Sequence, residues 1–230
     1  MLDLKNIEVL TFDCYGTLID WESGILKALK LVWVAHRINL GDSQILATYA
    51  ELEADAEAGQ YISYREVLQK VMQGFGQKFN FSPSKLEATA LADSLKDWPP
   101  FPDTVEALQK LKKKFKLGII SNTDDDLFAQ TQKHLKVDFD WIITAEQVKS
   151  YKPSQNNFLK AIEKIGRPKE KILHVAQSVY HDIIPAKSLG LATVLVRRHG
   201  AGATLPTEGK PDLEVPDLKT LASIIEEVKK

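Results

Sequence analysis

The sequence has little cysteine and almost no excess of charge of either sign. Its 230 residues include a single cysteine, Cys14, which excludes an internal disulfide and a cysteine-rich zinc site. We expect Cys14 to be a small apolar residue of the core. The 30 basic and 31 acidic residues give a formal net charge of -1. No overall field would attract nucleic acid or an anionic membrane, so we predict neither as a partner.

Long apolar runs are missing as well. No stretch approaches the roughly 20 apolar residues that a membrane-spanning helix needs. No basic segment followed by an apolar run marks a signal peptide at the N-terminus. These absences predict a cytoplasmic protein. The length suits one large domain, or one domain that carries a smaller insert.

Short apolar runs alternate with longer amphipathic segments, as is typical of a parallel sheet with helices on both faces. The predicted fold is therefore α/β, with a Rossmann-like core. Residues 200–217 are rich in glycine and proline and are predicted to form a surface loop before a final helix. The predicted strands are Val9–Phe12, Leu117–Ile120, Trp141–Thr144, Ile172–Ala176 and Ala192–Val196.

Residues 22–97 show helical periodicity almost throughout and contain no buried strand pattern. The segment Trp98-Pro-Pro-Phe-Pro102 ends this region, because proline disfavours helical geometry at and before itself. We therefore predict a core domain made of residues 1–18 and 98–230, with an all-helical cap inserted at residues 19–97. The predicted cap helices are Ile25–Ala35, Ser43–Ala58, Tyr64–Phe75 and Pro83–Asp93.

An acid, Asp13, directly follows the first predicted strand and precedes a Gly16-Thr17 turn. An ionised carboxylate at the end of a core strand is costly to desolvate unless a partner neutralises or uses it. Ligands of open parallel sheets bind beyond the carboxyl ends of the strands. The polar residues past the other strand ends are Ser121 and Asn122, then Lys152, then Gln177, Ser178 and Asp182. Their convergence predicts a site at this edge.

These residues form four short motifs that resemble, in order and over nearly the whole chain, the four motifs of the haloacid dehalogenase superfamily. The closest likeness is to the L-2-haloacid dehalogenase type, whose first motif has a tyrosine where phosphatases of the superfamily carry a second aspartate. The motifs are Asp13-Cys14-Tyr15-Gly16-Thr17, Ser121-Asn122, Lys152-Pro153 and the loop from Gln177 to Asp182.

The resemblance implies a role for each residue. Asp13 resembles the nucleophile, and Thr17 and Ser121 resemble the hydroxyls that hold it. Lys152 resembles the cation that stabilises the nucleophile, and Asp182 the acid that positions the lysine. Residues that resemble substrate or halide contacts are Tyr15, Asn122, Gln177 and Ser178.

The implied reaction is cleavage of the carbon–halogen bond of short 2-haloalkanoic acids, which gives 2-hydroxy acids. A carboxylate can displace halide from an sp3 carbon, and water then hydrolyses the ester on the enzyme. The phenol of Tyr15 is a weak general acid at pH 7, and a halide, unlike an alkoxide, leaves without a proton. Gln177 stands where the phosphatases supply magnesium with an aspartate, so we predict no metal and no cofactor.

The sequence departs from this group at the substrate end. The group's cap carries an arginine in the helix that corresponds to Ser43–Ala58, and no arginine occurs there. Arg65 is the predicted substitute, with Arg37 as the other choice. Phe158 replaces a tyrosine that is usual in the group.

Several alternatives remain open. The chain could be a magnesium-dependent phosphatase of the same fold, or a binding protein that has lost catalysis, and it could be a monomer or a homodimer. His181 could act as a base or only hold a structural hydrogen bond, and His174 is predicted to pack in the core. Arg197 and Arg198 are predicted on the surface. The aromatic residues expected near the cap hinges, as pocket lining or as packing, are Trp21, Tyr61, Tyr64 and Trp98.

Overall fold

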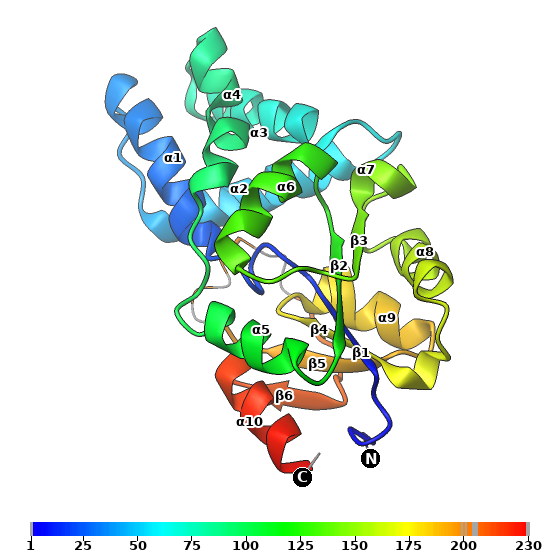
Figure 1. Cartoon of the computed structure of the whole chain (residues 1–230). Coiled ribbons are helices and arrows are strands. Elements are labelled where there is room, and N and C mark those ends of the chain that lie inside the picture. The colour runs from blue at the N-terminus through cyan, green and yellow to red at the C-terminus, as the bar shows by residue number, and fades with distance from the viewer. Residues whose placement is uncertain (1, 199, 201, 204–206, 229–230) are drawn as a thin grey trace.

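The computed structural model describes residues 2–198, 200, 202–203 and 207–228. A six-stranded sheet, parallel throughout, runs through the molecule in the order β3-β2-β1-β4-β5-β6 (Figure 1). Strand order reverses at β1, which pairs with β2 on one side and β4 on the other. The strands are β1 (Val9–Phe12), β2 (Lys116–Ser121), β3 (Trp141–Thr144), β4 (Ile172–Ala176), β5 (Ala192–Val196) and β6 (Leu213–Val215).

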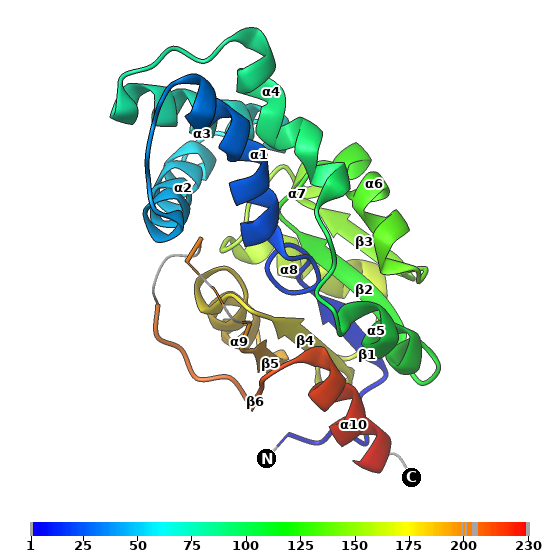
Figure 2. The same ribbon diagram turned by 90° about the vertical axis from the view of Figure 1, so that its left-hand side faces the viewer.

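Helices cover both faces of the sheet, which explains why all four residues of β1 are buried. Helices α5 (Thr104–Lys112), α6 (Asp125–Leu135) and α10 (Leu218–Val228) lie on one face (Figure 2). Helices α8 (Gln155–Ile165) and α9 (Ile184–Ser188) lie on the other. The short elements are α7 (Ala145–Val148), η1 (Leu95–Asp97), η2 (Lys169–Lys171) and η3 (Val179–Ile183).

Four helices, α1 to α4, pack on one another beyond the carboxyl ends of the strands (Figure 1). Ser63 and Ser84 start the third and fourth helix with capping boxes, in which each serine and the glutamate three residues later satisfy each other's backbone N–H groups. The bounds are α1 (Trp21–Ala35), α2 (Asp42–Glu57), α3 (Tyr64–Phe79) and α4 (Lys85–Ser94).

The predicted α/β fold is confirmed, and the five predicted strands are present with shifts of at most one residue at an end. Helical structure also fills the predicted cap region, while the division into two domains stays a prediction. The loop prediction for residues 200–217 was wrong in part, because β6 extends the sheet beside β5. This strand has three residues between Pro211 and Pro216, too few for a strand pattern. Residues 201 and 204–206 lie outside the described part of the chain.

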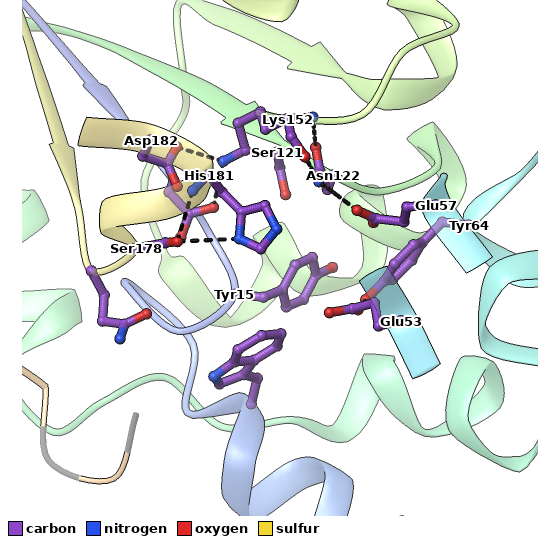
Figure 3. Close-up of a pocket in the computed structure, with 13 residues that line it drawn as sticks. Tyr15, Glu53, Glu57, Tyr64, Ser121, Asn122, Lys152, Ser178, His181 and Asp182 are labelled. Atoms are coloured by element: carbon purple, nitrogen blue, oxygen red, sulfur yellow. Dashed lines mark hydrogen bonds and ion pairs between the residues drawn. The ribbon is translucent and has the colours of Figure 1, made fainter. Parts of the chain in front are cut away.

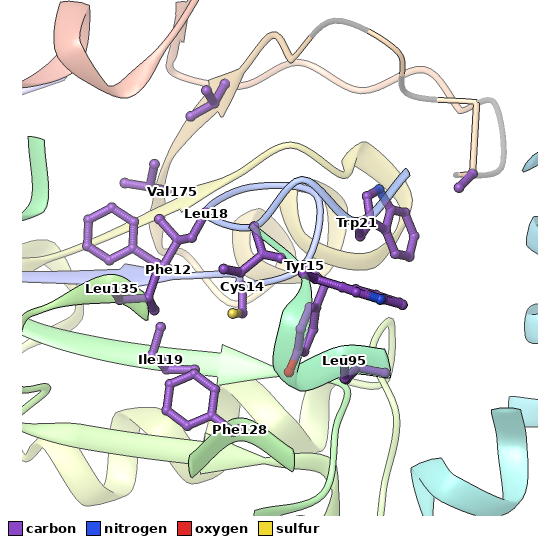
Figure 4. Packing of buried hydrophobic residues seen from close by; sticks show 14 of the residues in the cluster. Phe12, Cys14, Tyr15, Leu18, Trp21, Leu95, Ile119, Phe128, Leu135 and Val175 are labelled. Atoms are coloured by element: carbon purple, nitrogen blue, oxygen red, sulfur yellow. The ribbon is translucent and has the colours of Figure 1, made fainter. Parts of the chain in front are cut away.

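An apolar cluster supports the loop that follows β1. Cys14 is fully buried in it, as predicted, and Figure 4 shows it close to Phe12, Leu18 and Ile119. Because the residues on either side of Asp13 are fixed in this cluster, the position of its carboxylate is well defined. Among the described helices, none is long and apolar enough to cross a membrane.

Candidate active site

Asp13 lies at the carboxyl end of β1, where the strand order reverses, and its carboxylate meets a lysine from a distant loop. Nζ of Lys152 donates to Oδ1 of Asp13 at 2.8 Å and to Oδ1 of Asp182, in η3, at 2.7 Å. It also donates to the carbonyl of Ile120 at 3.0 Å. All three charged side chains are buried, with exposed fractions of 10%, 2% and 1% for Asp13, Lys152 and Asp182. One cation thus bridges two carboxylates.

The second oxygen of Asp13 is held by Thr17. The hydroxyl of Thr17 donates to Oδ2 of Asp13 at 2.7 Å and accepts from the backbone N–H of Gln177 at 2.9 Å. The turn itself is fixed from below by Arg198, whose guanidinium donates to the carbonyl of Thr17. Both carboxylate oxygens of Asp13 are therefore oriented before any substrate binds.

The prediction that Arg198 lies on the surface was wrong. Its side chain is only 6% exposed and pairs with Asp103 at 2.7 Å. The Arg198 guanidinium is buried because it has two partners there. It donates to the carbonyl of Thr17 in the turn after β1, and its charge is balanced by Asp103, just after the segment Trp98–Pro102. Arg197, by contrast, is 65% exposed.

His174 lies within β4 and is both packed and hydrogen-bonded. Its Nε2 is 2.9 Å from Oδ1 of Asp182, and its Nδ1 is 2.9 Å from the hydroxyl of Thr11 in β1. Phe158 packs edge-on against the ring. The histidine thus supports, from within the core, the acid that positions Lys152.

Burial and ion pairing shift the pKa values of Asp13, Lys152 and Asp182 in opposite directions. Burial would lower the pKa of Lys152, but Asp13 and Asp182 outweigh it and hold that pKa above its usual value. Burial raises the pKa of Asp13, and Lys152 and Thr17 offset this only in part. For Asp182, Lys152 and His174 overcome burial, so its pKa is lowered. Asp13 is therefore the more basic of the two carboxylates.

Ser121 ends β2, Asn122 follows it, and the two side chains have different surroundings. The Asn122 side chain clamps the backbone of Lys152, accepting from its N–H at 2.7 Å and donating to its carbonyl at 3.0 Å. Oγ of Ser121 is buried and has no hydrogen-bond partner among the described residues. Both residues line a cavity of about 40 Å³ above Asp13. That volume suits a substrate of few atoms.

The cavity brings together most of the residues predicted from the sequence. Asp13, Tyr15, Ser121, Asn122, Lys152, Gln177, Ser178 and Asp182 all line it, as do Trp21, Tyr64 and His181. Thr17 lies behind Asp13 and acts through it. Tyr61 and Trp98 are packing residues instead: Tyr61 stacks on Tyr151, and Trp98 contacts the ring of Tyr15 edge-on.

His181 faces the cavity and is held by its own loop. Its Nδ1 is 3.1 Å from the hydroxyl of Ser178, which also accepts from the His181 backbone N–H at 3.0 Å. Burial lowers the pKa of His181 to about 4. The ring is therefore neutral at pH 7.

The structure does not bring Arg65 into this site. Its guanidinium pairs with Asp126 on the surface, and its side chain is 41% exposed. The backbone explains this: the N–H groups of Tyr64 and Arg65 both donate to Asp124, which docks the start of α3 on the core and turns the Arg65 side chain outwards. Arg37 is exposed as well, so neither candidate arginine lines the cavity.

Two acids from α2, which sequence reasoning missed, line the cavity instead: Glu53 and Glu57 (Figure 3). Oε1 of Glu53 accepts from the hydroxyls of Tyr49 and Tyr64 at 2.8 and 2.7 Å. Glu57 accepts from the side-chain amide of Asn122 at 3.2 and 3.4 Å. Tyr49, Glu53 and Glu57 recur every four residues, and that spacing was the available signal for one shared helix face.

Both acids are harder to ionise than usual. Burial raises the pKa of Glu53 to about 7, against the hydrogen bonds from Tyr64 and Tyr49. Burial and the neighbouring Glu53 raise the pKa of Glu57, and Lys152 counteracts this in part. The two carboxyl groups lie one helical turn apart, so the protonation of one affects that of the other.

The donor set does not fit a magnesium ion. Lys152 already occupies one oxygen each of Asp13 and Asp182. Two residues beyond Asp13 the chain has Tyr15, whose hydroxyl is 2.8 Å from Thr131, and burial raises its pKa, so the phenol stays neutral. Within the described chain there is no group of three or more His, Cys, Asp or Glu side chains arranged to hold a metal. Magnesium takes hard oxygen ligands, usually carboxylates, and here the lysine competes with a cation for both aspartates.

Comparisons with known proteins agree with this fold. The chain is 28% identical to an (S)-2-haloacid dehalogenase of Pseudomonas fluorescens over 227 residues, which cover 96% of this chain and 97% of the relative. It is 31% identical to a glyceraldehyde 3-phosphate phosphatase of Methanocaldococcus jannaschii over 136 residues, 57% of this chain and 58% of the relative.

Among solved structures, an L-2-haloacid dehalogenase from Xanthobacter autotrophicus with chloropropionic acid covalently bound superposes with a TM-score of 0.79 at 20% identity. The match covers 96% of this chain and 98% of that one. The sequence model of one protein family, the haloacid dehalogenase-like hydrolases, matches residues 7–190, well over half of the chain. The chain therefore belongs to the haloacid dehalogenase-like hydrolases.

Proposed function

We propose that this protein hydrolyses the carbon–halogen bond of a small 2-halo compound through an ester on Asp13, with short 2-haloalkanoic acids as the first class to test. The observation that carries the proposal is the buried Asp13 carboxylate, paired with Lys152 at 2.8 Å, held by Thr17 at 2.7 Å and facing a small cavity. The names of the haloacid dehalogenase relatives support the choice of substrate.

The reaction requires no group beyond these residues and water. An oxygen lone pair of Asp13 attacks the halogen-bearing carbon, and the carbon–halogen bond breaks with both electrons on the departing halide. Water then adds to the Asp13 ester carbonyl and breaks the bond between that carbonyl carbon and the alkoxy oxygen. The alcohol product leaves, the carboxylate of Asp13 is restored, and one proton is released to solvent. Lys152 stabilises the negative charge on Asp13 before attack and on the ester carbonyl oxygen during hydrolysis.

The same geometry argues against phosphoester hydrolysis. An alkoxide leaving group requires a proton in the transition state, and the buried phenol of Tyr15 is a poor acid whose hydroxyl is engaged by Thr131. Halide departs without a proton. The first motif therefore favours a halogen leaving group.

The test is halide release from 2-chloropropionate and bromoacetate in the presence of EDTA. A single turnover with excess enzyme in heavy-oxygen water, followed by peptide mass spectrometry, should place one heavy oxygen in the peptide that contains Asp13. The variant D13N is the control and should acquire none. Phosphate release that EDTA abolishes, without halide release from any 2-halo compound, would favour the phosphatase instead.

A further inference from the structure

The α2 side of the cavity is acidic and, among the described lining residues, contributes no cation. Among the residues that line the cavity, the four carboxyl groups of Asp13, Asp182, Glu53 and Glu57 face a single lysine, and no arginine is present. Lys152 is committed to the two aspartates by contacts of 2.8 and 2.7 Å. No positive charge remains in the described lining for a substrate carboxylate to pair with.

Glu53 and Glu57 differ in how their oxygens are used. Two phenol hydroxyls already donate to Glu53. Glu57 receives only the long contacts from Asn122, whose amide makes its shorter contact, 3.0 Å, with the carbonyl of Lys152. A carboxyl group accepts several hydrogen bonds, so Glu57 offers further acceptor capacity toward the cavity. Figure 3 shows Glu57 extending from α2 toward Asn122 and Glu53 extending toward Tyr15.

The hydroxyl of Ser121 is a second polar group of the cavity that can still form a hydrogen bond. Oγ of Ser121 is buried, lines the cavity and has no hydrogen-bond partner in the described structure. A buried hydroxyl without a partner is uncommon in proteins and indicates a position where a ligand or water belongs. Ser121 and Glu57 together offer a hydroxyl and a hydrogen-bond acceptor, which suits a group that contains both C=O and N–H.

We propose that the Glu53–Glu57 pair selects substrates whose far end is an uncharged hydrogen-bond donor, so that a 2-halo carboxamide is turned over ahead of the matching 2-halo acid anion. The inference rests on the proposed function, the displacement of halide by Asp13. A carboxamide has nearly the shape of a carboxylate, and its carbonyl likewise activates the adjacent carbon–halogen bond. Its N–H groups donate to Glu57, whereas a carboxylate offers Glu57 no hydrogen-bond donor and meets no free cation in the described lining.

The experiment compares kcat/KM for 2-chloropropionamide and 2-chloropropionate at pH 8, where the pair carries more of its charge. We expect the amide to be preferred at least tenfold, mainly through KM. In the variant E53Q/E57Q the preference for the amide should fall at least tenfold, because kcat/KM for 2-chloropropionate rises. The matched control is E51Q. Glu51 lies on the same helix but is exposed and forms an ion pair with Lys78, so this variant should leave the preference unchanged.

Preference of the native enzyme for the acid, or an unchanged preference in E53Q/E57Q, would overturn the inference. If the double variant does not fold, as judged by its thermal melt, the single variants E53Q and E57Q replace it. If the native enzyme releases halide from neither compound, the proposed function fails. The inference is then decided by binding of the two compounds to D13N: tighter binding of the amide supports it, and equal or weaker binding refutes it.

Discussion

The part of the cavity formed by the sheet and the part formed by α2 treat charge in opposite ways. On the sheet side, Lys152 pairs with both Asp13 and Asp182 within 2.8 Å, and His174 supports Asp182 from the core. On the α2 side, Glu53 is buried and Glu57 half-buried, and the described hydrogen-bond donors to them are phenols and an amide. Paired charges can remain ionised when buried, whereas unpaired acids tend to bind protons.

We therefore assign the chemical reaction to the sheet side of the cavity and substrate recognition to the α2 side. In the proposed mechanism the sheet side supplies the nucleophile and its cation, and these residues lie at or after strand ends whose positions the fold dictates. In the same proposal the α2 side contributes no group to the displacement of halide and acts on the charge of the substrate. The experiments below disturb one side at a time.

The largest effect is expected on the sheet side, from D13N. The amide keeps the shape of the carboxylate and removes the nucleophile, so halide release should fall at least ~1000-fold. The thermal melt should change little or rise, because Asp13 carries a burial cost in the native protein. Halide release by D13N at a rate within tenfold of the native enzyme would show that Asp13 is not the nucleophile.

Removal of the shared cation should affect both stability and rate. The variant K152M leaves Asp13 and Asp182 buried without their partner, which costs about 3–5 kcal/mol of unfolding free energy. Urea unfolding at pH 7 measures this loss. The loss should shrink as the pH falls and the two carboxyl groups bind protons. K116M, at an exposed pair with Asp140, is the control and should cost less than about 1 kcal/mol.

On the α2 side, the turnover of a halo acid should depend on pH in a way that the turnover of its amide does not. Above pH 7 Glu53 ionises and adds negative charge, so kcat/KM for 2-chloropropionate should fall several-fold between pH 6 and pH 8.5. The ratio of the two substrates' kcat/KM cancels effects common to both, such as protonation of Asp13. A ratio that is constant over this range would show that the pair does not sense the substrate's charge.

The other groups around the pair do not titrate within that range. Burial lowers the pKa of His181 to about 4, and Asp13 and Asp182 hold the pKa of Lys152 above its usual value. Burial raises the pKa of the surrounding phenols, which belong to Tyr49, Tyr64 and Tyr151. A transition near pH 7 is therefore assigned to the coupled Glu53–Glu57 pair, and E53Q/E57Q should remove it.

Ionisation of Glu53 should lower the free energy of unfolding as the pH rises. Its pKa is about 7 in the folded protein, above the ordinary value of a glutamate, so the folded state holds a proton that the unfolded chain has released. The stability linked to this proton is complete below pH 4.5 and is lost as the pH rises through 7. E53Q should then gain on the order of 2 kcal/mol over the native protein between pH 5 and pH 8. Thermal or urea unfolding at both pH values measures the gain, and a constant difference would contradict it.

The sequence predicts the sheet side of the site far better than the α2 side. The strands β1, β2 and β4 are mostly apolar, buried runs, and Asp13, Asn122 and Gln177 directly follow them at motif positions. Glu53 and Glu57 have the four-residue spacing of many solvated helix faces, which carries no sign of burial. Only tertiary docking, through Asp124 and the start of α3, turns that face toward Asp13.

Arg198 and β6 illustrate the same limit. The burial of Arg198 depends on Asp103, 95 positions away in sequence, and β6 forms only because β5 offers a free edge to a three-residue segment. Long-range partners of this kind leave no local pattern.

The smallest effect is expected at Arg65, the residue that the sequence favoured for substrate binding. Its guanidinium pairs with exposed Asp126 outside the cavity, so R65A should change kcat/KM for either substrate less than about 3-fold and stability by less than about 1 kcal/mol. The backbone contacts of Arg65 with Asp124 remain in the variant. A loss above tenfold that is confined to the acid substrate would mean that Arg65 swings inward when an anion binds. The acidic α2 side would then have a cation to offset it.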